Sequence, residues 1–90
     1  MEYEIKDNAI RIKLDNRNYA NVTYHIEDDR IFLDSTFTPK QYRGKGIGGE
    51  LMKAAMAYSK SKGLKIIPVC SFSVEYFKKH PEYNSLLHKG

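Results

Sequence analysis

Residues 41–52, Gln-Tyr-Arg-Gly-Lys-Gly-Ile-Gly-Gly-Glu-Leu-Met, combine residue types that can bind an anion. Their four glycines let the backbone approach a ligand closely, because no side chain stands in the way. Arg43 and Lys45 bring positive charge, and an apolar periodic pattern that begins at Ile47 indicates that the loop opens onto a helix. Free N–H groups and the helix dipole favour anions at such a point. The segment therefore predicts a phosphate-binding loop.

Cys70 is a second candidate for chemistry, and it is the single cysteine of the chain. It follows the apolar run 64–69, and we expect Ser71 or Ser73 to cap a short helix that continues to about Lys79. The N-terminus of a helix favours the thiolate form of a nearby cysteine. The residues alone leave two interpretations open, a reactive nucleophile or a buried, inert side chain.

The elements that must position these residues follow from hydrophobic periodicity. Three segments alternate apolar and polar residues and are predicted as strands: 10–14, 20–26 and 31–37. Short polar turns join them, which predicts an antiparallel meander. Residues 3–6 can add an edge strand before the turn at Asp7-Asn8. On one face of the strand over 31–37 we expect Ile31, Leu33, Ser35 and Phe37.

After the glycine loop the pattern becomes helical. Apolar residues recur at spacings of three and four from Ile47 onward, and Gly63 follows a basic last turn, which predicts a helix over 47–62. The run 64–69 is predicted as a strand, followed by the short helix and a last helical turn near 83–87. A strand–helix–strand crossover is parallel and right-handed. The fold class is therefore α+β with an α/β crossover, in the order β-β-β-β-α-β-α.

Size and composition predict a single domain over 1–90. With 41% hydrophobic and 29% charged residues the chain fits a soluble globular protein, and no apolar run approaches the roughly 20 residues of a membrane span. The acidic start and the lone cysteine favour a cytoplasmic protein without an export signal. The net charge of +4 favours a polyanionic partner, either nucleic acid or a phosphorylated cofactor. No histidines have metal-ligand spacing, so no metal is predicted.

Two common phosphate motifs do not fit the glycine loop. Gly44, Gly46 and Gly49 match G-x-G-x-x-G, but a meander precedes the loop and no acidic residue closes the next strand. The loop also lacks the Gly-Lys-Ser/Thr of a P-loop. Instead, Gln41-x-x-Gly44-x-Gly46 and Arg43-x-x-Gly46-x-Gly48 resemble the pyrophosphate loop of GCN5-related N-acetyltransferases.

The downstream segments 65–72 (Lys-Ile-Ile-Pro-Val-Cys-Ser-Phe) and 76–83 (Tyr-Phe-Lys-Lys-His-Pro-Glu-Tyr) narrow this resemblance. They are similar to a small acetyltransferase-like subfamily with a cysteine at the end of the fifth strand, so a minimal fold of this superfamily is expected. The resemblance implies acetyl-coenzyme A in a gap between the strand that ends near Thr38 and the strand that ends at Cys70. It implies cofactor contacts from Phe37, Thr38, Arg43, Gly44, Lys45, Gly46, Ile47, Gly48, Gly49, Cys70, Ser71 and Lys79.

Acetyl transfer to an amine needs a base, an oxyanion donor and an acid for the leaving thiolate. A backbone N–H at Phe37 or Thr38 could be the donor. The family often uses a tyrosine after the fifth strand as the acid, a position that falls on Phe77, so its neighbour Tyr76 is the candidate. Ser35, Thr36 and Phe37 offer no base, and His25 is expected to be solvated. Cys70 could instead carry the acetyl group in a two-step route.

We therefore predict an acetyl-coenzyme A-dependent N-acetyltransferase that is a monomer or weak dimer, with an unidentified small-molecule or protein amine as acceptor. The positive net charge disfavours strongly basic peptides as acceptors. A non-catalytic acyl-coenzyme A binding or sensing module is the alternative, consistent with the missing acid and base. A nucleic-acid-binding domain ranks last, because the basic residues are spread over all elements.

Overall fold

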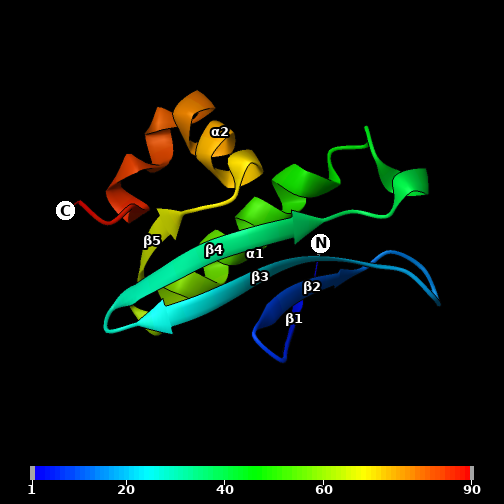
Figure 1. Ribbon diagram of the computed structural model, residues 1–90, viewed down its shortest axis with the longest axis horizontal. Helices are drawn as coiled ribbons and strands as arrows, with labels where there is room; N and C mark the ends of the chain where they lie inside the picture. Colours follow the sequence, from blue (N-terminus) through cyan, green and yellow to red (C-terminus); the bar gives the residue numbers. More distant parts are fainter. Residues whose placement is uncertain (1, 90) are drawn as a thin grey trace.

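The computed structural model describes residues 2–89, in which five strands form one sheet with the order β1-β2-β3-β4-β5 (Figure 1). The strands are β1 (Glu4–Lys6), β2 (Ala9–Lys13), β3 (Tyr19–Glu27), β4 (Arg30–Phe37) and β5 (Lys65–Pro68). The helices are α1 (Ile47–Lys62) and α2 (Ser71–Lys79), with the 3₁₀ helices η1 (Lys40–Tyr42) and η2 (Pro81–Leu86). This order confirms the predicted arrangement, including the edge strand at the N-terminus.

The first four strands form the predicted antiparallel meander. Its first turn has positive φ at both Asp7 and Asn8, the left-handed geometry of a tight hairpin turn that Asn and Asp tolerate better than other residues. Along β3, alternate side chains are buried, namely Ala20, Val22 and Tyr24. The alternation of apolar and polar residues in this strand therefore matches the alternation of buried and less buried side chains.

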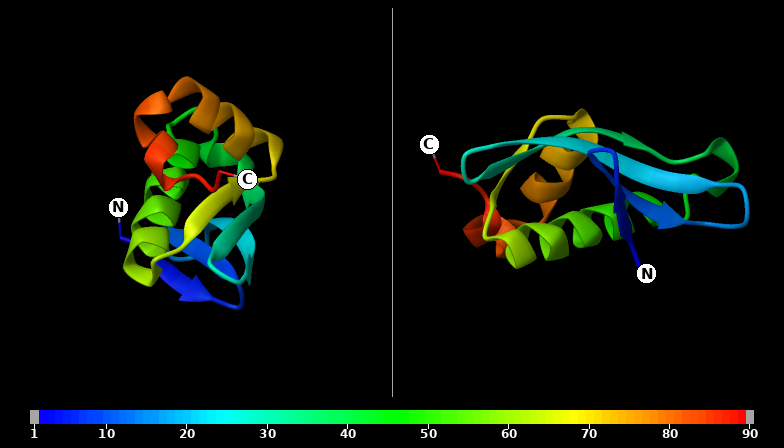
Figure 2. Two further views of the ribbon diagram at one scale, coloured as in Figure 1. Left: turned by 90° about the vertical axis from the view of Figure 1, so that its left-hand side faces the viewer. Right: turned by 90° about the horizontal axis from the view of Figure 1, so that it is seen from below.

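Helix α1 covers one face of the sheet (Figure 2). It buries the residues that recur at spacings of three and four, among them Leu51, Met52 and Ala55, against the inner face of β2, β3 and β4. The helix ends at Gly63, whose φ of +68° gives the left-handed C-cap predicted from the sequence. Apolar burial between helix and sheet is what holds the long crossover connection in place.

Strands β4 and β5 are parallel neighbours over only four residue pairs, from Arg30 opposite Lys65 to Leu33 opposite Pro68. Beyond this point the Leu33 carbonyl accepts hydrogen bonds from the N–H groups of both Val69 and Cys70, at 3.1 and 3.0 Å. After that the ladder ends, and the last residues of β4 have no β5 partner in the part of the chain that the structure describes. The two strands therefore part at Leu33, and we call this place the fork.

A β-bulge in β4 corrects one prediction. Tyr24 lies opposite Leu33 and Thr23 opposite Ser35, so Asp34 is an extra residue in β4. The extra residue reverses which side chains face the core, because the side-chain period of a strand is two. Ser35 is exposed and lies 2.5 Å from the hydroxyl of Thr23, and Phe37 is 51% exposed. The prediction that Ser35 and Phe37 share one face of the strand with Ile31 and Leu33 is therefore wrong.

The helix after β5 begins differently from the prediction. Cys70 occupies the N-cap position and makes no side-chain capping hydrogen bond, so neither Ser71 nor Ser73 caps α2. The hydroxyl of Ser73 is fully buried and donates to the carbonyl of Cys70 at 2.9 Å, one turn back. After η2 the chain returns to β5, where the N–H of His88 donates to the Ile66 carbonyl at 2.9 Å.

Candidate active site

A groove of about 490 Å³ lies where the end of β4, the glycine loop and the starts of both helices meet. Its lining residues are Thr36, Phe37, Thr38, Tyr42, Arg43, Gly44, Gly46, Ile47, Gly48, Gly49 and Phe72. Eight of the twelve predicted cofactor contacts lie in this set: Phe37, Thr38, Arg43, Gly44, Gly46, Ile47, Gly48 and Gly49. Residues from two distant parts of the sequence, the β4 end and the loop, thus lie along one groove.

Two glycines of the loop need their residue type for the backbone alone. Gly44 and Gly46 both have φ of +80°, which an L side chain adopts only with strain. A β-carbon built at either position would meet no atom within 4 Å, so it would project into open space rather than into protein. These positions are therefore free of side chains where a ligand would approach.

The first turn of α1 presents its backbone amides to the groove. Gly46 is the N-cap residue and contributes no side-chain cap. The N–H of Glu50 makes the first hydrogen bond of the helix, to the Gly46 carbonyl at 3.2 Å. The N–H groups of Ile47, Gly48 and Gly49 come before it, and such amides have no acceptor inside their own helix. They form the positive end of a sixteen-residue helix, which is a general anion-binding arrangement.

Two contacts fix the loop that leads into this turn. The guanidinium Nε of Arg43 donates to the carbonyl of Thr38 at 3.1 Å, which closes the loop across η1. The hydroxyl of Tyr42 donates to the carboxylate of Asp15, in the hairpin between β2 and β3. The hydrogen bond from Tyr42, together with those from the N–H groups of Arg17 and Asn18, holds the pKa of Asp15 well below its usual range. Hydrogen bonds to Asp15 and Thr38 therefore hold the loop in place without a bound ligand.

Phe72 closes the groove from the side of α2. A β-carbon at Gly48 would lie only 2.4 Å from Cζ of Phe72, so the ring packs directly against the backbone of α1. The ring is still 42% exposed and lines the groove. The absence of a side chain at position 48 is thus explained by the neighbouring helix and not only by a ligand.

Four predicted cofactor contacts lie outside the groove lining. Lys45 and Ser71 are exposed but do not line the groove, and Lys79 lies seven residues beyond Phe72, about 10 Å further along α2. The fourth, Cys70, lies at the fork, half-buried, with Sγ 3.2 Å from the hydroxyl of Ser73. Its thiol is therefore a neighbour of the groove, and its hydrogen bond points it toward the first turn of α2.

Tyr76, the candidate acid, packs in an aromatic cluster behind the groove. Its ring centroid lies 4.3 Å from that of His80 and 5.5 Å from that of Phe77. Burial raises the pKa of Tyr76, and the nearby charges of Tyr83, Glu82 and Glu50 raise it further, so the phenol keeps its proton at neutral pH. Tyr76 does not line the groove, and its neighbour Phe77 is buried in the core.

Sequence reasoning missed several residues near the groove. Thr36, Tyr42 and Phe72 line it, although none of them was predicted as a contact. Phe72 had no local signal in the sequence, because its position depends on how α2 packs against α1. His25 was expected to be solvated, and its side chain is 47% exposed, but it also pairs with Asp34 and Glu27. Asp34 escaped notice because the bulge that exposes it leaves no signature in the alternation.

Within residues 2–89, no helix combines the length and apolarity of a membrane span. Over the same residues, no three His, Cys, Asp or Glu side chains gather in a way that could hold a metal ion.

Sheet, fork and glycine loop together define a small α+β protein in which the first amides of a long helix lie beside an unpaired strand edge. Comparison with known proteins specifies the class. The model of a family described as GCN5-related N-acetyl-transferase matches residues 2–86, so the chain belongs to this family. No curated protein matches the chain.

Among solved structures, the chain is similar to a GCN5-like candidate N-acetyltransferase from Staphylococcus aureus, whose solution structure was determined by NMR. The two share 28% sequence identity with a TM-score of 0.77, and the match covers 99% of this chain and 89% of that one. The similarity therefore extends over the whole sheet and both helices, in agreement with an acetyltransferase-like function.

Proposed function

We propose that this protein is an N-acetyltransferase that uses acetyl-coenzyme A and transfers the acetyl group directly to an amine. One observation carries the proposal. The amides at the start of α1 lie in the same groove as the β4 edge that β5 leaves unpaired. A diphosphate fits the first feature, and an extended arm with amide groups fits the second.

The residues present fit such a carrier. Gly44 and Gly46 leave open space above the loop, and the amides of the first turn of α1 supply donors without side-chain competition. Arg43 adds positive charge at the rim of the groove. The last residues of β4, up to Phe37 and Thr38, would pair with the pantetheine arm. The backbone N–H and C=O groups along an unpaired strand edge can hydrogen-bond to the amides of an extended ligand. When bound, the carrier supplies an acetyl thioester.

The position of Cys70 favours direct transfer over a covalent route. Its Sγ lies 3.2 Å from the Ser73 hydroxyl, and the residue does not line the groove. Tyr76 holds its proton at neutral pH, as an acid must, but it does not line the groove. Oxyanion stabilisation would come from backbone N–H groups at the end of β4, at Phe37 or Thr38.

Calorimetry with acetyl-coenzyme A tests the binding part of the proposal. Gly46→Ala places a methyl group in the groove and should weaken binding by tenfold or more. Gly63→Ala is a matched control, since Gly63 also has positive φ and open space but lies at the other end of α1. Equal affinities of the two variants would contradict the assignment of the groove.

A thiol-release assay tests the catalytic part. The protein is incubated with acetyl-coenzyme A and primary amines, and both free thiol and acetylated amine are measured. We expect equal amounts of the two products. Binding of acetyl-coenzyme A without any acetylated amine would instead define an acyl-coenzyme A binding module.

A further inference from the structure

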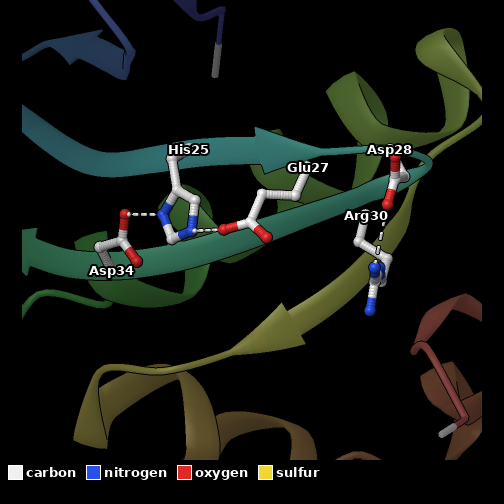
Figure 3. Close-up of polar contacts among 5 residues, drawn as sticks. All are labelled: His25, Glu27, Asp28, Arg30 and Asp34. Carbon is white, nitrogen blue, oxygen red and sulfur yellow. Dashed lines mark hydrogen bonds and ion pairs between the residues drawn. The ribbon is translucent and has the colours of Figure 1, made fainter.

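A polar cluster lies on the sheet face that points away from α1 (Figure 3). His25 of β3 lies between two carboxylates, with Nδ1 2.7 Å from Oδ2 of Asp34 and Nε2 3.1 Å from Oε2 of Glu27. Its ring stacks on the ring of Phe32, with centroids 4.4 Å apart and planes 7° apart. Two hydrogen bonds and a stacked ring hold the orientation of this exposed imidazole.

The cluster lies beside the fork. Asp34 is the bulged residue of β4, one position after Leu33, whose carbonyl accepts both the Val69 and Cys70 amides. It comes two positions before Thr36, which lines the groove, and a strand advances about 3.3 Å per residue. The bulge therefore places a carboxylate, and through it His25, at the inner end of the unpaired β4 edge.

The cluster lies on the face of the sheet opposite α1 (Figure 3). Its cross-strand neighbour Phe32 lies on the outer face, whereas Ile31 and Leu33 are buried under α1. The glycine loop and the start of α1 lie on the helical side. A molecule that approached His25 would thus reach the fork without competing for the amides at the start of α1.

We infer that His25 is the base that takes a proton from the acceptor amine, that Asp34 is its positioning residue, and that Glu27 binds the positive charge of the amine. The inference rests on the proposed function, because it places the acetyl thioester at the fork. It also names the acceptor class: a primary amine that arrives as a cation. The net charge of the whole protein disfavours basic acceptors, but the carboxylates of Glu27 and Asp34 lie directly beside His25, with Arg30 opposite Glu27 on β4.

The geometry supports each role. In neutral His25, Nδ1–H donates to Asp34, which leaves the lone pair of Nε2 facing Glu27. The two atoms are 3.1 Å apart, so only a proton on Nε2 fits between them. An alkylammonium can donate to both groups once the Glu27 side chain, which is 61% exposed, turns aside from Nε2.

The transfer balances in the following way. The amine nitrogen forms a bond to the acetyl carbonyl carbon, and the bond from this carbon to sulfur breaks, with its electron pair remaining on sulfur. The ammonium loses two protons. One passes through Nε2 of His25 to solvent, and the other converts the thiolate to a thiol. Without a base, the attacking nitrogen stays protonated and has no lone pair for the attack.

The charges around His25 set the pH range of this step. The hydrogen bond that His25 donates to Asp34 is the largest influence and raises the pKa of His25, burial opposes it, and Glu27 adds to the increase. The other charged groups nearby are Arg30, bound to Asp28 at 3.2 Å, and Lys65, whose Nζ donates to the carbonyl of Ser85. A raised pKa keeps the imidazolium to higher pH, so the rate should rise as the pH passes above the ordinary range of histidine.

Kinetics with glycine amide as the acceptor test the inference in the full chain. His25→Gln should lower kcat by about a hundredfold, a typical contribution of a general base, while calorimetry shows an unchanged affinity for acetyl-coenzyme A. Asp34→Asn should move the rise of the pH–rate profile to lower pH, because His25 loses the partner that raises its pKa. Asp28→Asn is the control, since it removes a charge from the same hairpin without contacting His25.

The outcomes separate the inference from the proposed function. If wild-type protein acetylates glycine amide and His25→Gln does so equally well, or if Asp34→Asn and Asp28→Asn have the same pH profile, the inference is wrong and the proposed function stands. If acetyl-coenzyme A binds but glycine amide is not acetylated between pH 6 and pH 10, the assignment of this acceptor class is overturned. If acetyl-coenzyme A does not bind, the proposed function itself fails.

Discussion

The ring of Phe72 in α2 lies against the backbone of Gly48 in the first turn of α1. A β-carbon at position 48 would lie 2.4 Å from Cζ and 2.9 Å from Cε1 of this ring. The contact brings together the starts of the two helices that follow the two diverging strands. It also forms one wall of the groove, so the packing of the helices and the shape of the candidate site depend on the same pair of residues.

Gly48→Ala should therefore destabilise the fold. Alanine is a better helix residue than glycine by up to about 1 kcal/mol, but the added methyl group forces Phe72 to move, and overpacking costs about 1–3 kcal/mol. We expect a net loss of about 1 kcal/mol in the free energy of unfolding, measured by urea denaturation. Gly49→Ala is the control, because its β-carbon would lie 3.8 Å from Tyr76, at ordinary contact distance. A Gly48→Ala variant as stable as Gly49→Ala would contradict the role of the contact.

Tyr42→Phe removes the hydroxyl that donates to Asp15. The pKa of Asp15 is lowered in the folded state, first by this bond, so its contribution to stability is present above its ordinary pKa and is lost as the pH falls below it. The wild type should be more stable than Tyr42→Phe at pH 6, and the difference should shrink toward pH 2. Denaturation at several pH values measures this. If wild type and Tyr42→Phe differed in stability by the same amount at pH 6 and at pH 2, the hydrogen bond would not act through the charge of Asp15.

Tyr24 should be among the last tyrosines to ionise. Burial, followed by the hydrogen bond to Tyr58, raises its pKa to about 12. The folded state therefore favours the neutral phenol of Tyr24. Its contribution to the free energy of unfolding is complete below about pH 10 and is lost as the pH rises toward 12. In an ultraviolet titration, Tyr24→Phe should remove part of the phenolate signal that forms above pH 11. An unchanged high-pH signal would show that Tyr24 titrates with the exposed tyrosines.

Cys70→Ser separates the two routes of acetyl transfer. The serine hydroxyl can replace Sγ as the partner of Ser73, so the start of α2 should be kept. Direct transfer predicts that this variant acetylates an amine within about threefold of the wild-type rate, because no bond to Cys70 is formed. Mass spectrometry of wild-type protein incubated with acetyl-coenzyme A checks the same point. An acetyl adduct on Cys70, together with inactivity of the serine variant, would establish the covalent route.

Much of the fold could be predicted because its signals are local. The alternation over β3, the periodicity from Ile47 and the glycine at position 63 each act within one element, and the structure has each of these elements. The parallel pairing of β4 and β5 followed from the length of the crossover between them. Much of the groove lining could also be located, because a single loop contributes Arg43, Gly44 and residues 46–49.

The features that escaped prediction depend on contacts between elements. The bulge at Asp34 exists because β3 and β4 pair with unequal numbers of residues, and nothing in either strand alone reveals it. The pairing of His25 with Asp34 follows from that bulge. Cys70 takes the N-cap position because its N–H binds the Leu33 carbonyl at the fork, which leaves the predicted serine caps unused. Phe72 was not expected to line the groove, since its position depends on how α2 packs against α1.

The central claim is that the amides at the start of α1 hold the diphosphate of acetyl-coenzyme A beside the unpaired edge of β4. Amide chemical shifts of the ¹⁵N-labelled protein, recorded during a titration with acetyl-coenzyme A, test it most directly. We predict that the largest shifts occur at residues 44–49 and 36–38. Saturable binding with its largest shifts elsewhere, for instance around Arg11, Lys13 and Tyr19, which line a separate groove, would contradict the claim.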